Sequence, residues 1–430
     1  MSQLFSRSSF RAGLVLCLVL SLAQTSIGYS VLTHEEIIDL LWADHIKKLL
    51  LKRFPDATDD QLREAHAYAY GGSVIQDMGY YPLGNKEFSN LVHYVRSGDF
   101  VSALLHDAAD INEYAFALGA LSHYVADNAG HPTVNHAVAV EYPKLRAKYG
   151  DQVTYGEDPK AHVKTEFGFD VVEVAKHRYP SDAYHDFIGF KVAKPLLERA
   201  FRKTYGIELK DVFGSLDMAI GTYRRSVSKI IPEMTRVALL SKRVDIVRDT
   251  PNFSEKKFLY RLSRTEYERE WGVDYKKPGP GARILAFLFR IVPKVGPFKA
   301  LDFKIPTTAT EAEFIKSIVS TTDQYQTLVD GLRIGPIRLI NRDCDTGKPT
   351  RPGEYKLTDA AYAQLLHRLS LRSFDLLTPE LKENVTSYYS DLNAPFATKK
   401  STDRWKMTLL ELDNLKAAPA LKAASPTSRN

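Results

Sequence analysis

Histidine is concentrated in one part of the chain and is accompanied there by carboxylates at helical spacing. Eleven of the twelve histidines fall within residues 34–185. Five potential metal ligands recur at steps of four residues, namely His123, Asp127 and His131, and then His162 and Glu166. Four residues turn an α-helix by about 40° beyond a full turn, so each set forms one stripe on its helix. Imidazole and carboxylate are ligands for zinc, or less specifically for manganese or iron, so the stripes predict a metal site.

The segments around both stripes carry signals for the ends of helices. Asp110 begins a sequence that resembles a capping box, ahead of a segment rich in Ala, Leu, Phe and Tyr. Gly130 and Pro132 predict the end of that first helix. Asp158 is a plausible N-cap for the second helix, with Pro159 at its first position. Both motifs are therefore expected near helix ends, where their side chains can reach a shared pocket.

Helical periodicity dominates the rest of the chain, and few runs alternate with a period of two. We therefore predict an all-α, mainly helical fold. The segments with long helical patterns are 33–52, 59–76, 111–128, 158–177, 210–242, 310–332 and 357–372.

The first 28 residues have the layout of a secretory signal peptide. Arg7 and Arg11 precede a twelve-residue apolar run, and small residues follow it. That run is too short to span a bilayer, and no other segment is long and apolar enough to do so. We predict an exported protein, secreted or periplasmic, with cleavage after Gly28 or after Ala23.

Charge and cysteine content restrict the chemistry. Loss of the first 28 residues changes the formal net charge from +6 to +4, because that segment carries two arginines and no acid. This mild bias selects no class of partner. Cys17 leaves with the segment, so Cys344 is the one cysteine of the expected mature chain and an internal disulfide is excluded. Zinc sites without thiolate ligands are more often reactive than structural.

Three further side chains precede the two stripes in a recognisable order: His34, Asp77 and His93. The complete ordered set resembles the zinc-dependent phospholipase C family, whose sister branch is the fungal single-strand nucleases. The likeness runs from about residue 29 to residue 170. It implies a mainly helical domain with three zinc ions in a cleft, and a new N-terminal residue that ligates zinc through its amino and carbonyl groups.

Carried over position by position, the resemblance implies three zinc sites. The first site would take Asp77, His93, His123 and Asp127. The second would take His131, His162 and Glu166, and the third Tyr29, His34 and the other oxygen of Asp127, which would bridge two ions.

Two positions depart from the usual family pattern. The family usually begins with Trp, whereas here Tyr29 would be first, and only if cleavage follows Gly28. The bacterial enzymes place the next histidine six residues after the aspartate, whereas here His131 comes at four and His136 at nine. The spacing of four resembles the glycosylphosphatidylinositol-specific phospholipase D branch. We favour His131 because it stays on the helical stripe, and His136 is the alternative.

The resemblance implies an exported, zinc-dependent phosphodiesterase that hydrolyses the glycerol-side phosphate bond of a phospholipid. Zinc lowers the pKa of a bound water to about 7 and neutralises charge on phosphoryl oxygens. Asp77 is the candidate catalytic residue, because it could orient or deprotonate the attacking water. Asp170 continues the second stripe and is expected to support the ligands.

Two other functions compete with this one. A single-strand nuclease would use the same zinc cluster and stack bases on aromatic side chains, for which Tyr80, Tyr81 and Tyr124 are candidates. The other competing function is that of a non-catalytic, zinc-stabilised binding protein, whose function would reside in the C-terminal half.

The predicted organisation has four parts. Residues 1–28 form the signal peptide, 29–245 the catalytic domain, 246–410 a C-terminal helical region without readable chemistry, and 411–430 a disordered tail. Within the third part, residues 283–303 interleave apolar with basic side chains. Such a run could make peripheral contact with a lipid headgroup layer, and an ordinary buried helix is the competing interpretation.

Overall fold

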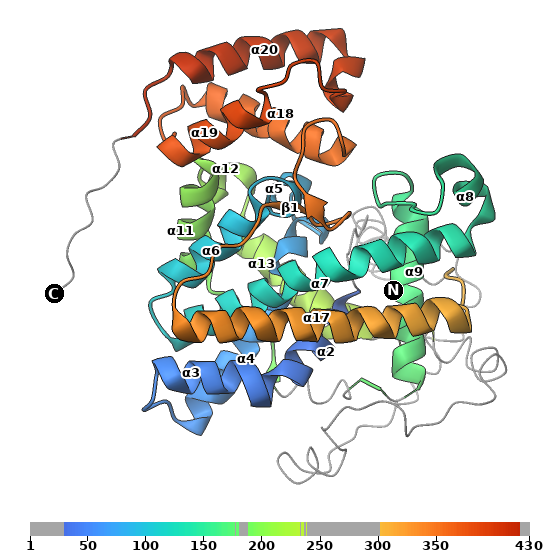
Figure 1. Cartoon of the computed structure of the whole chain (residues 1–430). Coiled ribbons are helices and arrows are strands. Elements are labelled where there is room, and N and C mark those ends of the chain that lie inside the picture. Colours follow the sequence, from blue (N-terminus) through green and yellow to red (C-terminus); the bar gives the residue numbers. More distant parts are fainter. Residues whose placement is uncertain are drawn as a thin grey trace, which may run out of the picture.

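A computed structural model describes residues 30–176, 178–179, 188–232, 234–235, 238 and 302–421. The described residues are mostly helical, which confirms the predicted all-α class (Figure 1). Two short strands, β1 (Arg342–Asp343) and β2 (Lys348–Pro349), pair antiparallel.

The first helices are α2 (Val31–Leu41), the π-helical turn η1 (Trp42–Ile46), α3 (Lys47–Arg53), α4 (Asp59–Ser73), the 3-10 helix η2 (Ile75–Tyr80), α5 (Lys86–Tyr94) and α6 (Ser97–Asp107). They are followed by α7 (Ile111–Glu141), α8 (Pro143–Tyr149), α9 (Pro159–Ala175), α11 (Lys194–Tyr205), α12 (Leu209–Val212), α13 (Leu216–Arg225) and the π-helical turn η3 (Ser226–Ile230). The last helices are α17 (Thr308–Ile334), α18 (Lys356–Leu371), α19 (Pro379–Tyr388), the 3-10 helix η6 (Ala397–Lys400) and α20 (Thr402–Ala417).

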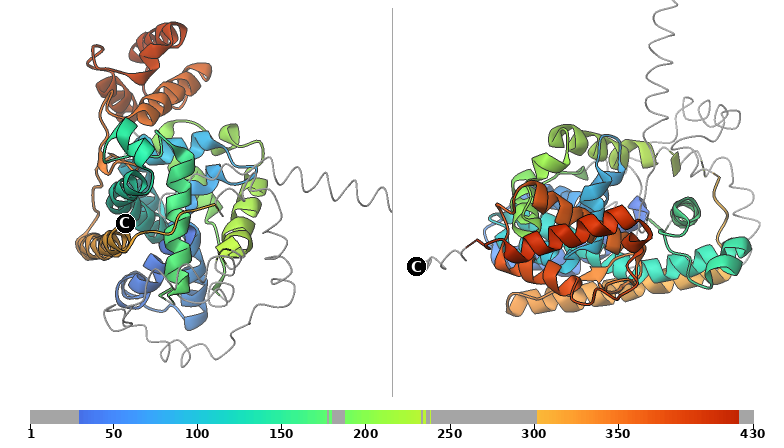
Figure 2. Two further views of the ribbon diagram at one scale, coloured as in Figure 1. Left: turned by 90° about the vertical axis from the view of Figure 1, so that its right-hand side faces the viewer. Right: turned by 90° about the horizontal axis from the view of Figure 1, so that it is seen from above.

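Helix α7 is the central element of the fold, with α4 and α17 packed along it (Figures 1 and 2). Glycine permits the close contact between α4 and α7. A Cβ on Gly72 would lie 2.0 Å from the Phe116 carbonyl oxygen, and one on Gly119 would lie 2.1 Å from that of Ala69. The two helices can therefore approach backbone to backbone, which places the stripe on α7 beside the end of α4.

The caps predicted at Asp110 and Asp158 are confirmed, but the predicted end of the first helix is wrong. Asp110 accepts a hydrogen bond from the third residue of α7, and Asp158 accepts two from the start of α9. Helix α7 continues through Pro132 to Glu141. Proline inside a helix removes one hydrogen bond and costs about 3 kcal/mol. Burial of the face that contains Val134, Ala137 and Val138 offsets this cost.

The C-terminal helices share their core with the N-terminal ones. One cluster of buried apolar side chains extends from Val31 to Leu415. Helices α18, α19 and α20 lie together above α5 and α12 in Figure 1. Helix α20 runs to Ala417 and buries Leu412 and Leu415, so it extends past residue 410 into the predicted tail.

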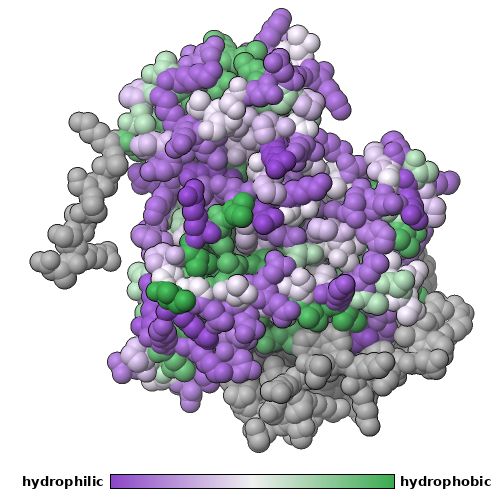
Figure 3. All heavy atoms as spheres, in the orientation of Figure 1, coloured by the Kyte–Doolittle hydropathy of each residue, from purple (hydrophilic) through white to green (hydrophobic). Residues whose placement is uncertain are grey.

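Within the described ranges, no helix is long and apolar enough to cross a membrane. The face of the molecule that carries α17 is mostly hydrophilic, with separate hydrophobic patches (Figure 3). Ile334 and Ile340, which flank the end of α17, are exposed.

Candidate metal centre

Four helices and one 3-10 helix bring the predicted ligands together. Helix α2 carries His34, η2 carries Asp77 directly after α4, and the last turn of α5 carries His93. Helix α7 supplies His123, Asp127 and His131, and α9 supplies His162 and Glu166. All eight side chains are buried.

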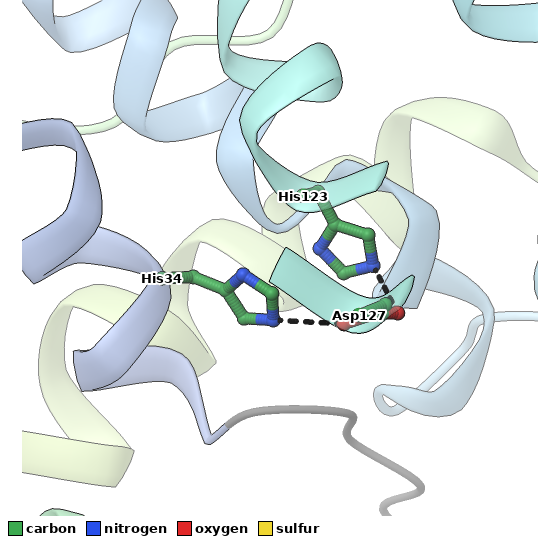
Figure 4. Close-up of side chains that lie close together, drawn as sticks. All are labelled: His34, His123 and Asp127. Atoms are coloured by element: carbon green, nitrogen blue, oxygen red, sulfur yellow. Dashed lines mark ion pairs between the residues drawn. The ribbon is translucent and has the colours of Figure 1, made fainter. Parts of the chain in front are cut away.

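Asp127 lies at the centre of this cluster, and its two oxygens face different histidines (Figure 4). Its Oδ1 lies 3.4 Å from His34 Nε2 and 3.9 Å from His131 Nε2. Its Oδ2 lies 3.0 Å from His123 Nε2 and 3.3 Å from His93 Nε2. This carboxylate can therefore contribute one oxygen to a ligand group on each of its two sides.

Three groups of these side chains have donor atoms close enough to share a metal ion. In each group, the ligand atoms lie within 4.8 Å of one another. The groups are His34, His123 and Asp127; Asp77, His93 and His123; and His131, His162 and Glu166.

The third group joins α7 to α9. His162 Nε2 lies 2.7 Å from Glu166 Oε1, across one turn of α9. His131 Nε2 lies 3.9 Å from the same oxygen. The two stripes recognised in the sequence thus face each other, as their helical spacing requires.

Main-chain carbonyl groups fix the orientation of three imidazole rings. His93 Nδ1 lies 2.7 Å from the Ser89 carbonyl oxygen, and His123 Nδ1 lies 2.8 Å from that of Ser73. His131 Nδ1 lies 2.8 Å from the carbonyl oxygen of Cys344. A carbonyl oxygen can only accept, so each Nδ1 donates its hydrogen. Each Nε2 then keeps a lone pair that points into the cluster, as a metal ligand needs.

The donor set fits divalent cations. Asp77, Asp127 and Glu166 have both carboxylate oxygens buried without a hydrogen-bond partner among the described residues. Buried carboxylates without hydrogen bonds cost several kcal/mol or more unless a positive charge compensates them. Imidazole and carboxylate together suit zinc.

Burial and neighbouring charge shift the pKa values of these groups. Burial opposes ionisation of Asp127, but His123 and His131 hold its pKa well below the usual value. Burial raises the pKa of the Glu166 carboxyl well above its usual value. A bound cation would oppose this shift, because it favours the ionised carboxylate.

The remaining predicted residues fall in three different places. Tyr29 lies outside the described residues. His136 lies away from the cluster, where its Nδ1 is 2.8 Å from Glu313 Oε2 on α17. Asp170 accepts hydrogen bonds from the Leu32 main chain at 3.0 Å and from the Thr33 hydroxyl at 2.7 Å, so it holds the start of α2.

The β1–β2 segment approaches the site, and no pattern in the sequence predicts this approach. Asp345, between the two strands, has its Oδ1 3.4 Å from His131 Nδ1. It is separated from the histidines of the stripes by more than 170 residues, so no local spacing could have revealed it. Tyr155 is a second residue near the site that was not predicted. Its ring centroid lies 6.4 Å from that of Tyr80, which in turn lies 6.1 Å from that of His93.

Residues 33–215 match the family model described as zinc dependent phospholipase C. No curated protein and no solved structure matches the chain. Eight of the nine predicted ligands lie inside the matched range, and Tyr29 lies before it. Over this range the chain resembles the zinc-dependent phospholipase C family.

Proposed function

We propose that the chain is a zinc-dependent phospholipase C-type enzyme that hydrolyses the glycerol-side phosphate bond of a phospholipid. The observation that carries this proposal is the convergence of three candidate ligand groups around Asp127, inside the range that matches the family. Phospholipid phosphodiesterase activity is what that family implies.

The proposal assigns the residues to three zinc ions. Asp77, His93, His123 and Asp127 would hold one, and His131, His162 and Glu166 a second. His34, Asp127 and the main chain of Tyr29 would hold the third. When bound, such ions lower the pKa of a bound water and neutralise charge on phosphoryl oxygens.

Asp77 is the proposed acceptor for the proton of the attacking water. Both of its oxygens are buried without a hydrogen-bond partner in the described part of the chain. Its Oδ1 lies 3.4 Å from His93 Nε2, which keeps the carboxylate at the edge of a ligand group. A carboxylate in this position can orient a water and then take up its proton.

The three tyrosines proposed for base stacking in the nuclease alternative give that alternative no support, because all three are buried. Tyr81 is buried, and so is Tyr124, whose hydroxyl donates to the Ile340 carbonyl oxygen at 2.5 Å. Base stacking needs an exposed ring face. Tyr80 is also buried, although it lies beside His93.

The activity test uses purified mature protein and vesicles of phosphatidylcholine. We expect diacylglycerol and phosphorylated headgroup with zinc, and neither product after chelation. Single-stranded DNA and RNA are assayed in parallel. Loss of nucleic acid without lipid cleavage would identify the nuclease, and zinc-loaded protein without either activity would identify a binding protein.

Two histidines on α7 provide a matched pair of variants. His131→Gln removes a proposed ligand, and we expect at least a hundredfold loss of lipid cleavage. His136→Gln alters the same helix five residues later, where the side chain contacts Glu313, and activity should be retained. The opposite result would transfer the ligand role to His136.

The proposal includes export directed by residues 1–28, with cleavage after Gly28. Residues 1–29 lie outside the described residues, and so do residues 283–301 of the run proposed to contact lipid headgroups. Sequencing the first residues of exported protein should give Tyr29. A mature chain that starts after Ala23 would remove Tyr29 from the ligand set.

A further inference from the structure

We propose that Cys344 and Asp345, in the β1–β2 segment of the C-terminal half, position His131 for metal binding. The inference rests on the proposed zinc site, and it assigns a role to residues outside the range that matches the family. It makes this part of the C-terminal half a component of the metal centre.

The main chain of Cys344 connects two of the proposed ligands. Its N–H donates to the His93 carbonyl oxygen at 3.2 Å. Its carbonyl oxygen accepts from His131 Nδ1 at 2.8 Å. One peptide segment thus contacts the backbone of a ligand on α5 and the ring of a ligand on α7.

The Asp345 side chain lies beside the same imidazole. Its Oδ1 is 3.4 Å from His131 Nδ1, on the opposite side of the ring from the nitrogen that faces Asp127. Its Oδ2 accepts hydrogen bonds from the hydroxyl groups of Tyr94, at 3.0 Å, and Tyr355. These two bonds hold the carboxylate in place.

Further contacts seat this segment tightly on α7. Asn135 Nδ2 donates to the Asp345 carbonyl oxygen at 2.8 Å. Gly347 has a positive φ of 67°, and a Cβ there would lie 2.3 Å from the Asn128 carbonyl oxygen. Cys344 and Asp345 are both buried. The position of the segment is therefore fixed by packing as well as by hydrogen bonds.

This arrangement has two consequences for His131. The Cys344 carbonyl holds the hydrogen on Nδ1, which leaves the Nε2 lone pair for a metal. The nearby negative charge of Asp345 makes the imidazole a stronger donor to that metal. Partners of this kind typically change metal affinity by 10- to 100-fold, about the effect expected here.

The test compares zinc binding by two variants of the full mature chain. Asp345→Asn keeps the shape of the side chain and an oxygen for the tyrosine hydroxyls, but it removes the charge. Asp359→Asn is the matched control: Asp359 is equally buried in the C-terminal half and accepts from Tyr388 at 2.6 Å, away from His131. Zinc content is measured against a graded series of chelator concentrations.

We expect Asp345→Asn to bind one equivalent of zinc about tenfold more weakly, and Asp359→Asn to bind like the wild type. In cobalt-loaded protein, the visible absorption reports ligand geometry. It should change in Asp345→Asn alone, whereas general loosening would change it in both variants.

The outcomes separate the two proposals. Wild-type zinc affinity and an unchanged cobalt spectrum in Asp345→Asn would overturn the inference while the proposed function stands. A wild-type chain that binds zinc without cleaving phospholipid would overturn the proposed function alone. A wild-type chain that binds no zinc would overturn both.

Discussion

Glu141, at the end of α7, is a buried carboxyl that belongs to none of the three ligand groups. Its Oε2 accepts from the Thr165 hydroxyl at 3.1 Å, and burial raises its pKa from 4.5 to about 7. The folded state therefore binds more protons than the unfolded state between these two values. Its contribution to stability is complete below about pH 4.5 and is lost as the pH rises to about 7.

Glu141→Gln should remove this pH dependence. The amide keeps an acceptor for Thr165 and carries no charge, so the variant should be more stable than the wild type at pH 8. A pKa shift of this size changes the free energy of unfolding by about 3 kcal/mol. The free energies of unfolding of the two proteins should converge near pH 4.5. Urea unfolding at both pH values measures the difference. The exposed Glu383→Gln serves as control, and equal pH slopes in all three proteins would contradict the assignment.

At the scale of residues, local spacing located the ligands on α7 and α9. His123 and Asp127 were predictable because residues four apart share a helix face whatever the tertiary structure is. His34, Asp77 and His93 have no such spacing, and the order of the family pattern was needed to find them. Neither helical spacing nor the family pattern could identify Asp345, because its contact with His131 depends on how the C-terminal half packs.

Among the elements, the β1–β2 segment depends on one glycine for its approach to α7. Gly347→Ala would place a methyl group 2.3 Å from the Asn128 carbonyl oxygen and would strain a positive φ. We expect the segment to move away from α7, with at least a tenfold loss of zinc affinity and a lower thermal midpoint. Calorimetry and zinc titration measure the two effects.

Gly353→Ala is the control for this substitution. Gly353 also has a positive φ, of 75°, but a Cβ there would meet the Pro395 ring instead of α7. This variant should lose stability and keep its zinc affinity. Equal losses of zinc affinity in the two variants would show that the effect of Gly347→Ala is not specific to the metal centre.

The helix boundaries show where sequence signals are sufficient. The starts of α7 and α9 were predicted because a capping side chain and the main-chain N–H groups it serves are neighbours in sequence. The C-terminal end of α7 was not predicted correctly, because Pro132 is tolerated through burial of the helix against elements distant in sequence. Local signals cannot report that contribution.

For the whole molecule, the shared core predicts that both halves unfold together. Arg368 on α18 donates to both carboxylate oxygens of Glu87, at 2.8 and 2.6 Å, and Glu87 lies on the helix that carries His93. The C-terminal helices are thus tied to an element of the metal centre. Tryptophan supplies local probes, because Trp42 stacks on His66 while Trp405 packs on Phe396.

Chelation should lower the unfolding midpoint reported by both probes equally. Free zinc at a thousandfold excess over its dissociation constant stabilises the folded state by about 4 kcal/mol per site, and removing it leaves the clustered carboxylates uncompensated. Variants that retain either Trp42 or Trp405, with the other tryptophans replaced by phenylalanine, allow each region to be followed by fluorescence during heating. A Trp405 midpoint that ignores chelation while that of Trp42 falls would show that the halves unfold separately. Because the shared core and the Arg368–Glu87 contact oppose such a separation, we expect one transition that shifts as a unit.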